Sequence, residues 1–130
     1  MSDDTLHVEL VAADRLVWSG EAKVVNARTA GGEIGILANH MPVLSLLEAG
    51  VLEVETADGD TVLAAVDDGF ISVAANRVSI LAGHADLAAD IDAGEARSQL
   101  DQARGDAEDQ RGEAEVRRLE ARVRAAEQVS

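Results

Sequence analysis

The sequence predicts a mainly β protein with an α-helical appendage, in which an antiparallel sandwich or barrel is followed by a two-helix hairpin. Up to residue 87, short segments that alternate apolar and polar side chains are separated by Gly, Asp and Asn, which is typical of such β folds. Beyond Asp90 the helix formers Ala, Glu, Gln and Arg dominate. We therefore expect a β domain over residues 1–87 and a helical hairpin over residues 88–130.

The charge balance changes between the same two parts of the chain. The net charge of the 130 residues is -14. Residues 1–90 hold 15 acidic and four basic side chains, whereas residues 91–130 hold ten acidic side chains and seven arginines. A compositional shift of this kind marks a domain boundary.

The predicted strands begin with residues 5–12, where every second side chain is apolar, the period of a half-buried strand. Asp58-Gly59 is a hairpin signal of the kind that favours type I′ turns. The other predicted strands are residues 16–19, 21–29, 51–56, 61–66, 70–74 and 77–81.

Residues 30–54 interrupt this regular pattern. They contain three glycines within five residues, at positions 31–35, and Pro42, the only proline of the chain. Glycine tolerates positive φ, and proline withholds a donor from a sheet. We expect an irregular, exposed connection between strands, and loops of this kind commonly carry a protein's contacts.

Two short amphipathic helices are predicted for the C-terminal part. Asp92 is expected to cap the first, with Glu95 three residues later as in a capping box, and the polar stretch 106–111 is expected to break the helix. The apolar stripes are Ala96, Leu100, Ala103 and Ala107, then Val116, Leu119, Val123 and Ala126. Since each buried CH₂ contributes only about 0.8 kcal/mol, these thin stripes should hold the hairpin marginally against the β domain.

Composition and motifs exclude several classes of function. The chain has no cysteine, so it has neither a disulfide nor a thiolate metal site, and its three histidines are scattered. It has no apolar run long enough to span a bilayer, and its acidic charge argues against nucleic acid. No phosphate-loop motif is present, and the Asp pairs at 58/60 and 67/68 are typical of turns. We expect no enzymatic activity of its own, no cofactor, no metal and no direct membrane insertion.

The run Gly-Glu-Ile-Gly-Ile-Leu-Ala-Asn-His-Met-Pro-Val-Leu-Ser-Leu-Leu-Glu-Ala-Gly, from Gly32 to Gly50, resembles the signature of the ε subunit of F-type ATP synthases, G-E-x-G-I-L-P-x-H-x-P-L-L-x-x-L-x-x-G. Residues 17–22 resemble the family's [FY]-S-G turn, and residues 67–73 resemble its GGFLEV strand. Ala38 stands where the signature has proline, which loosens the turn slightly. The resemblance covers essentially the whole chain.

The resemblance implies a flattened ten-stranded antiparallel β-sandwich followed by the hairpin. It implies a noncatalytic rotor component of a proton-translocating ATP synthase, at the cytoplasmic face of the bacterial cell membrane. The sandwich would couple the γ shaft to the membrane-embedded c-ring. The hairpin would move between a folded-down state and an extended state, contact the α and β subunits transiently and restrain ATP hydrolysis.

Four residues of the 30–54 stretch are candidates for the rotor interface. Carried over by position, Glu33 would face the polar loop of the c subunits, and His40 would lie toward the γ shaft, with Met41 and Pro42 beside it. From the residues alone, Glu33 is an exposed turn carboxylate and His40 a histidine that satisfies nearby backbone groups. The resemblance favours the functional interpretation.

Four arginines crowd the last helix, and two interpretations stay open. They could form a solvated face, in which Arg118 and Arg122 pair with Glu115 and Glu120 and suit the helix dipole. Alternatively, they form a patch that docks on acidic segments of the catalytic β subunits when the hairpin extends. The four residues are Arg117, Arg118, Arg122 and Arg124.

Some family members carry an ATP-binding motif, I/L-D-x-x-R-A, at the start of the first helix. The corresponding residues are Ile91, Asp92, Glu95 and Ala96. Glu95 replaces the arginine, and an acid at this position should repel a nucleotide's phosphates. We predict no ATP binding or only weak binding. The alternative function, a nucleotide-sensing regulatory module, would require saturable ATP affinity.

Overall fold

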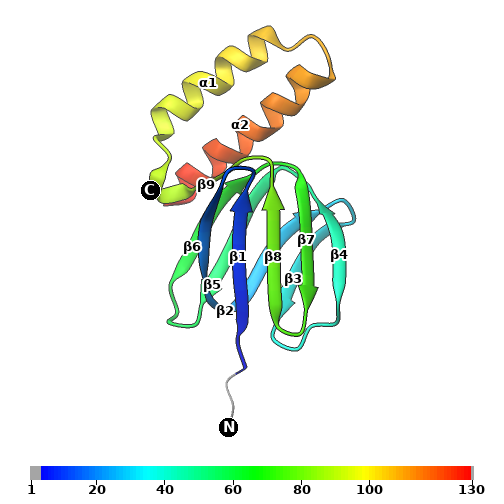
Figure 1. Cartoon of the computed structure of the whole chain (residues 1–130). Helices are drawn as coiled ribbons and strands as arrows, with labels where there is room; N and C mark the ends of the chain where they lie inside the picture. Colours follow the sequence, from blue (N-terminus) through cyan, green and yellow to red (C-terminus); the bar gives the residue numbers. More distant parts are fainter. Residues whose placement is uncertain (1–3, 130) are drawn as a thin grey trace.

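The computed structural model describes residues 4–129 and consists of a two-layered β-sandwich followed by two helices. Figure 1 shows both helices at one end of the sandwich, opposite the start of β1. The elements are β1 (Leu6–Ala12), β2 (Arg15–Thr29), β3 (Gly32–Leu37), β4 (Val43–Leu47), β5 (Gly50–Thr56), β6 (Thr61–Val66), β7 (Gly69–Ala74), β8 (Arg77–Ala82), β9 (Ala85–Leu87), the short 3₁₀ helix η1 (Ala88–Asp90), α1 (Ala93–Asp106) and α2 (Gln110–Val129).

The long strand β2 joins the two layers. Its first half pairs with β1, and its second half pairs with β3 and β5. The predicted strands 16–19 and 21–29 were wrong as separate elements, because register shifts opposite β1 and β5 let one bent strand serve both layers. The described residues therefore form nine strands, so the expected count of ten was wrong, whereas the predicted sandwich followed by a helical pair is confirmed.

Strand pairing is antiparallel throughout the described sheet except between β1 and β8, which run parallel. The neighbours in order are β1, β8, β7, β4, β2, β5, β6 and β9, with β3 on β2. β1 and β8 are distant in sequence, so no hairpin turn imposes an antiparallel direction on them.

The expectation of an irregular connection over residues 30–54 was mostly wrong. β3 forms a full ladder with β2, and β4 forms one with β7, so only residues 38–42 lack strand structure between them. Gly32 has a φ of 117° at the β2–β3 turn, where glycine's freedom is needed. Gly35 and Gly50 lie within strand ladders, where ladder hydrogen bonds hold the extended backbone in place.

The β5–β6 hairpin predicted from Asp58-Gly59 is present, but its turn differs from the expected one. Gly59 has a φ of 92°, whereas Asp58 is not among the described residues with positive φ. A type I′ turn requires positive φ at both central residues. The turn signal therefore located the hairpin correctly without fixing its turn type.

Two clusters of buried side chains form the interior. The larger cluster lies between the sandwich layers and is almost entirely aliphatic, with Ile36, Ile71 and Ile80 among its fully buried members. The smaller cluster lies between the hairpin and one end of the sandwich. α2 rests against β5 and β6, and α1 packs on α2. Ala65 is the one buried side chain that the β-sandwich contributes to this second cluster.

The helices match the predicted periodicity with two corrections. Asp92 Oδ1 accepts a hydrogen bond of 2.9 Å from the Glu95 backbone N–H, which caps α1. α1 ends at Asp106, so Ala107 lies beyond it and is not part of its stripe. α2 has 20 residues and is not short. No helix in residues 4–129 has the length and apolar character that crossing a membrane requires.

Candidate functional site

The β3–β4 connection, residues 38–42, presents its side chains at the end of the sandwich opposite the hairpin. Asn39 donates its backbone N–H to Asn76 Oδ1 over 2.5 Å, and Asn76 Nδ2 donates to Asn39 Oδ1 over 3.3 Å. His40 Nδ1 lies 2.7 Å from the Met41 carbonyl oxygen. The Met41 side chain is 71% exposed, and Pro42 is exposed as well. This connection is therefore anchored to the β7–β8 turn and projects an apolar side chain outward.

Glu33 lies away from this connection. It follows the β2–β3 turn, opposite Arg28 in the ladder, while residues 38–42 follow the other end of β3. Glu33 is exposed and lines a hollow of about 690 Å³ together with Arg124 of α2. The four predicted rotor residues thus form two separate surfaces, one carrying Glu33 and the other carrying His40, Met41 and Pro42.

A continuous apolar row crosses one outer face of the sandwich, over strands that Figure 1 shows side by side. The row consists of Leu46 of β4, Phe70 of β7, Leu81 of β8, Val11 of β1 and Leu16 of β2, each the register partner of the next. Phe70 and Leu81 are each 51% exposed. A contiguous exposed apolar patch on a sheet face is typical of a protein interaction surface.

Sequence reasoning missed this apolar row. β7 and β8 bury alternate residues, so a one-sided sheet should carry polar side chains at the positions between them. Phe70 and Leu81 stand at such outward positions. Apolar residues at these outward positions could have indicated an exposed apolar patch from the sequence alone. The cross-strand register that places the two residues side by side could not be predicted from the sequence.

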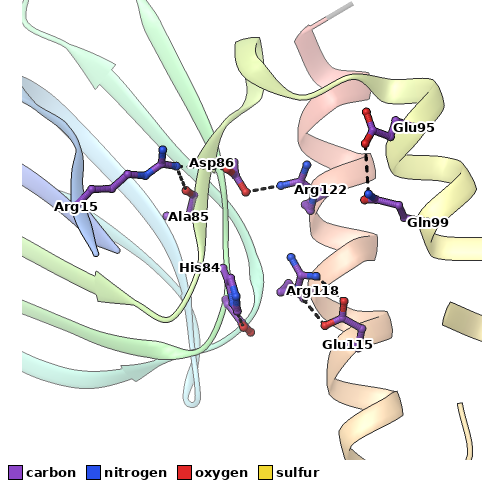
Figure 2. Close-up of polar contacts among 10 residues, drawn as sticks. Arg15, His84, Ala85, Asp86, Glu95, Gln99, Glu115, Arg118 and Arg122 are labelled. Atoms are coloured by element: carbon purple, nitrogen blue, oxygen red, sulfur yellow. Dashed lines mark hydrogen bonds and ion pairs between the residues drawn. The ribbon is translucent and has the colours of Figure 1, made fainter. Parts of the chain in front are cut away.

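Arg118 and Arg122 of α2 point toward the strand β9 side of the sandwich, as Figure 2 shows. Arg122 forms an ion pair with Asp86 of β9, and Arg118 forms one with Glu115 within the helix. The expected pairing of Arg122 with Glu120 was wrong, because residues two apart on a helix do not face each other. Glu120 instead pairs with Arg104 of α1 at 3.1 Å.

The Glu115–Arg118 pair shifts the ionisation of both groups. The hydrogen bond from Arg118 lowers the pKa of the Glu115 carboxyl below its ordinary value. The same hydrogen bond raises the pKa of Arg118, with smaller contributions from the charges of Asp67 and Asp86. Both groups are therefore charged across the physiological range.

Arg117 and Arg124 are in a different situation from the other two arginines. Both are exposed, and within residues 4–129 neither makes an ion pair or side-chain hydrogen bond. They line a hollow of about 350 Å³ together with Arg28 and the acidic side chains of Glu48, Asp68 and Glu120. The four predicted arginines thus divide into two that are paired and half-buried and two that remain available.

The positions of the degenerate ATP motif have structural roles in this fold. Ile91 and Ala96 are buried in the hairpin cluster, and Asp92 caps α1. Glu95 is exposed, with Oε1 3.5 Å from Gln99 Nε2. Within the part of the chain that the structure describes, no group of His, Asp and Glu is arranged to hold a metal ion.

The matching family is described as "ATP synthase, Delta/Epsilon chain, beta-sandwich domain", and the match spans residues 5–87. The ATP synthase epsilon chain of Streptomyces avermitilis is 56% identical over 97 residues, covering 75% of this chain and 78% of the relative. The chain belongs to the ATP synthase epsilon-chain family. The epsilon chain of Rhodococcus jostii is 54% identical over 94 residues, covering 72% of this chain and 77% of that one. An epsilon chain is a noncatalytic subunit of the ATP synthase complex.

Solved structures agree with this epsilon-chain assignment. A chain in the Euglena gracilis mitochondrial ATP synthase assembly of OSCP, F1 and c-ring has a TM-score of 0.80 and 25% identity, covering 97% of this chain and 83% of that chain. A chain of the Tetrahymena thermophila mitochondrial ATP synthase central stalk and c-ring has a TM-score of 0.60 and 18% identity, covering 99% and 98%. The second likeness supports the fold.

Proposed function

We propose that this epsilon chain is a rotor component of a bacterial proton-translocating ATP synthase, attached peripherally at the cytoplasmic face of the membrane. Its sandwich, residues 1–87, couples the γ shaft to the c-ring. Its hairpin, residues 88–130, restrains ATP hydrolysis by contacting the α and β subunits transiently. The chain transmits mechanical work, so it needs no catalytic residue or cofactor of its own.

The apolar row is the observation that best supports the proposed contact with γ. Five neighbouring strands present Leu, Phe and Val side chains at one level of a rigid face, and a hollow of about 490 Å³ adjoins Leu46 and Phe70. Such a surface suits a helical partner that offers its own apolar stripe. His40, Met41 and Pro42 extend the contact at the other end of the sandwich.

The test of this contact is the affinity of the full chain for isolated γ. Phe70→Ser should weaken binding about tenfold, the loss typical of a central aromatic anchor. Glu55→Ser, an exposed change on β5, should leave the affinity unchanged. Equal affinity of Phe70→Ser and the parent chain would remove the apolar row from the γ interface.

Glu33 is proposed to face the polar loop of the c subunits. Its exposed position beside the β2–β3 turn separates it from the γ-facing connection at the other end of β3. One residue can therefore reach the ring while the others reach the shaft. A Glu33→Cys chain in the assembled complex should cross-link to a cysteine in the polar loop of c, and persistent failure to do so excludes this orientation.

The proposed inhibitory role is supported by how the hairpin packs. Most of its buried side chains are alanines, and Val51 and Leu63 of the sandwich are only partly covered by it. With about 25 cal/mol per Å² of apolar area buried, this thin cluster allows detachment at modest cost. The unpaired Arg117 and Arg124 suit acidic segments of the catalytic ring.

This role is tested by the ATPase rate of the ε-depleted catalytic complex after adding back either the full chain or a version that ends at Asp90. The full chain should slow hydrolysis, and the truncated chain should bind without slowing it. If both bind and act alike, the hairpin has no inhibitory role. If neither binds, the proposed place in the complex is wrong.

A further inference from the structure

Asp86 of β9 lies between two arginines from distant parts of the chain (Figure 2). Its Oδ2 accepts from Arg122 Nη1 of α2, and its Oδ1 lies 3.4 Å from Arg15 Nη2 of β2. Arg15 Nη2 also donates to the Ala85 carbonyl oxygen over 3.2 Å. We call this arrangement of Arg15, Asp86 and Arg122 the Asp86 bridge. It connects the hairpin to the sandwich through charged side chains.

The Asp86 bridge is partly shielded from water. The side chains of Arg122 and Asp86 are 22% and 33% exposed, whereas Arg15 is 56% exposed. Charges attract more strongly where water is partly excluded, so the Arg122 side of the bridge matters more than the Arg15 side. Arg122 Nε is buried and has no hydrogen-bond partner among the described residues. Removing Asp86 would therefore leave a half-buried guanidinium without compensation.

The apolar contact beside the Asp86 bridge does little to fix the position of α2 on the sandwich. Ala65 is the one buried residue of the β-sandwich in the hairpin cluster, and α2 contributes three alanines there besides Leu119 and Val123. Each alanine buries little apolar area and so contributes little to holding α2 on the sandwich. The bridge, in contrast, joins one defined position of α2 to one defined position of β9.

Arg118 also forms an ion pair, with Glu115 of the same helix. The side chains of Arg118 and Arg122 are thus 20% and 22% exposed and each is paired, unlike Arg117 and Arg124. In the docked state, Arg122 donates from Nη1 to Asp86 Oδ2, so that N–H group is not available to another carboxylate. Docking on the sandwich and binding an acidic partner therefore compete for the same N–H group of Arg122.

We propose that the Asp86 bridge holds the hairpin on the sandwich and that Arg122 exchanges Asp86 for a carboxylate of the catalytic subunits when the hairpin extends. The docked and extended states compete for the Arg122 guanidinium. Asp86 therefore sets the fraction of molecules whose hairpin is free to inhibit. The exchange rests on the proposed function, whereas the holding role concerns the chain alone.

The holding role is tested on the isolated full chain. Spin labels go on cysteines at Glu53 and Gln128, which line the same hollow, and the chain has no native cysteine. The distance distribution then reports the docked fraction. Asp86→Asn keeps the shape of the side chain and removes its charge. It should raise the undocked-to-docked ratio about fivefold, which corresponds to the strongest ion pairs measured at exposed sites.

Asp58→Asn is the matched control, because it makes the same chemical change in the β5–β6 turn, at the end of the sandwich away from the hairpin (Figure 1). Its distance distribution should match that of the parent chain. Arg122→Gln tests the bridge from the helix side, so the proposal stays testable if Asp86→Asn folds poorly. The double variant should undock no more than the stronger single variant.

A docked fraction that stays unchanged in both Asp86→Asn and Arg122→Gln overturns the holding role. The exchange is tested in the catalytic complex, where Asp86→Asn should inhibit hydrolysis more than the parent chain and Arg122→Gln should inhibit it less. If Asp86→Asn undocks the hairpin without increasing inhibition, the exchange is overturned while the holding role stands. If the parent chain itself does not inhibit, the proposed function has failed instead.

Discussion

Asn39 and Asn76 exchange two hydrogen bonds across 37 positions of sequence, one from the Asn39 backbone N–H and one from the Asn76 side chain. Both residues have positive φ, 68° and 62°, a conformation that asparagine tolerates better than most residues. The pairing ties the β3–β4 connection, with His40 and Met41, to the β7–β8 turn. The candidate γ-facing surface is therefore held by two residues outside any strand.

Two substitutions of Asn76 separate the contribution of its hydrogen bonds to stability from the cost of its positive φ. Asn76→Gly keeps the backbone conformation and loses the hydrogen bonds, which should cost about 1 kcal/mol. Asn76→Ala also places a Cβ in the left-handed region, for a further cost of roughly 1 kcal/mol. Urea unfolding followed by the fluorescence of Trp18, the only tryptophan, measures both. Equal stability of the two variants would contradict the assigned backbone strain.

Gly69 allows β7 and β8 to approach closely. A Cβ built at this position would lie 1.8 Å from the Leu81 carbonyl oxygen, a distance that only a backbone shift can relieve. Gly69→Ala should destabilise the chain by more than about 3 kcal/mol, as overpacking against backbone does at its upper range. Gly31→Ala, with its nearest neighbour at 3.9 Å, is the control and should cost little. A stable Gly69→Ala protein would show that the two strands can separate.

Acid should weaken α2 through Glu115. Because Arg118 lowers the folded-state pKa of Glu115 below its ordinary 4.5, the pair's stabilisation is fully present above about pH 4.5 and disappears as the pH falls through the lowered value. Amide exchange of α2 between pH 3 and pH 6 follows this loss. Glu115→Gln should remove that part of the pH dependence, and identical profiles for both proteins would refute the assignment.

The chain should bind ATP weakly or not at all. Glu95 places a negative charge in the first turn of α1, where the family's motif has an arginine, and Ile91 and Ala96 are occupied in packing. Calorimetric titration of the isolated full chain should show no saturable heat at micromolar ATP. Micromolar affinity would instead support the nucleotide-sensing alternative.

Local pattern was enough to predict much of the fold. The alternation in residues 5–12 and the capping sequence from Asp92 to Glu95 depend on neighbours within a few positions, and both appear in the structure. The glycine-rich stretch misled the prediction, because β3 and β4 are held by partners in β2 and β7. Single-sequence propensity does not include those ladder hydrogen bonds.

The sequence by itself determined the family, the order of β and α parts, and the identity of candidate residues such as Glu33, His40 and Arg122. The tertiary structure decided which of them share a surface. It separated Glu33 from His40, joined Phe70 to Leu81 and brought Asp86 to Arg122 across 36 positions. The physical reason is that local periodicity determines which face of a strand or helix a side chain occupies. Register and packing between distant segments depend on how the whole chain folds together.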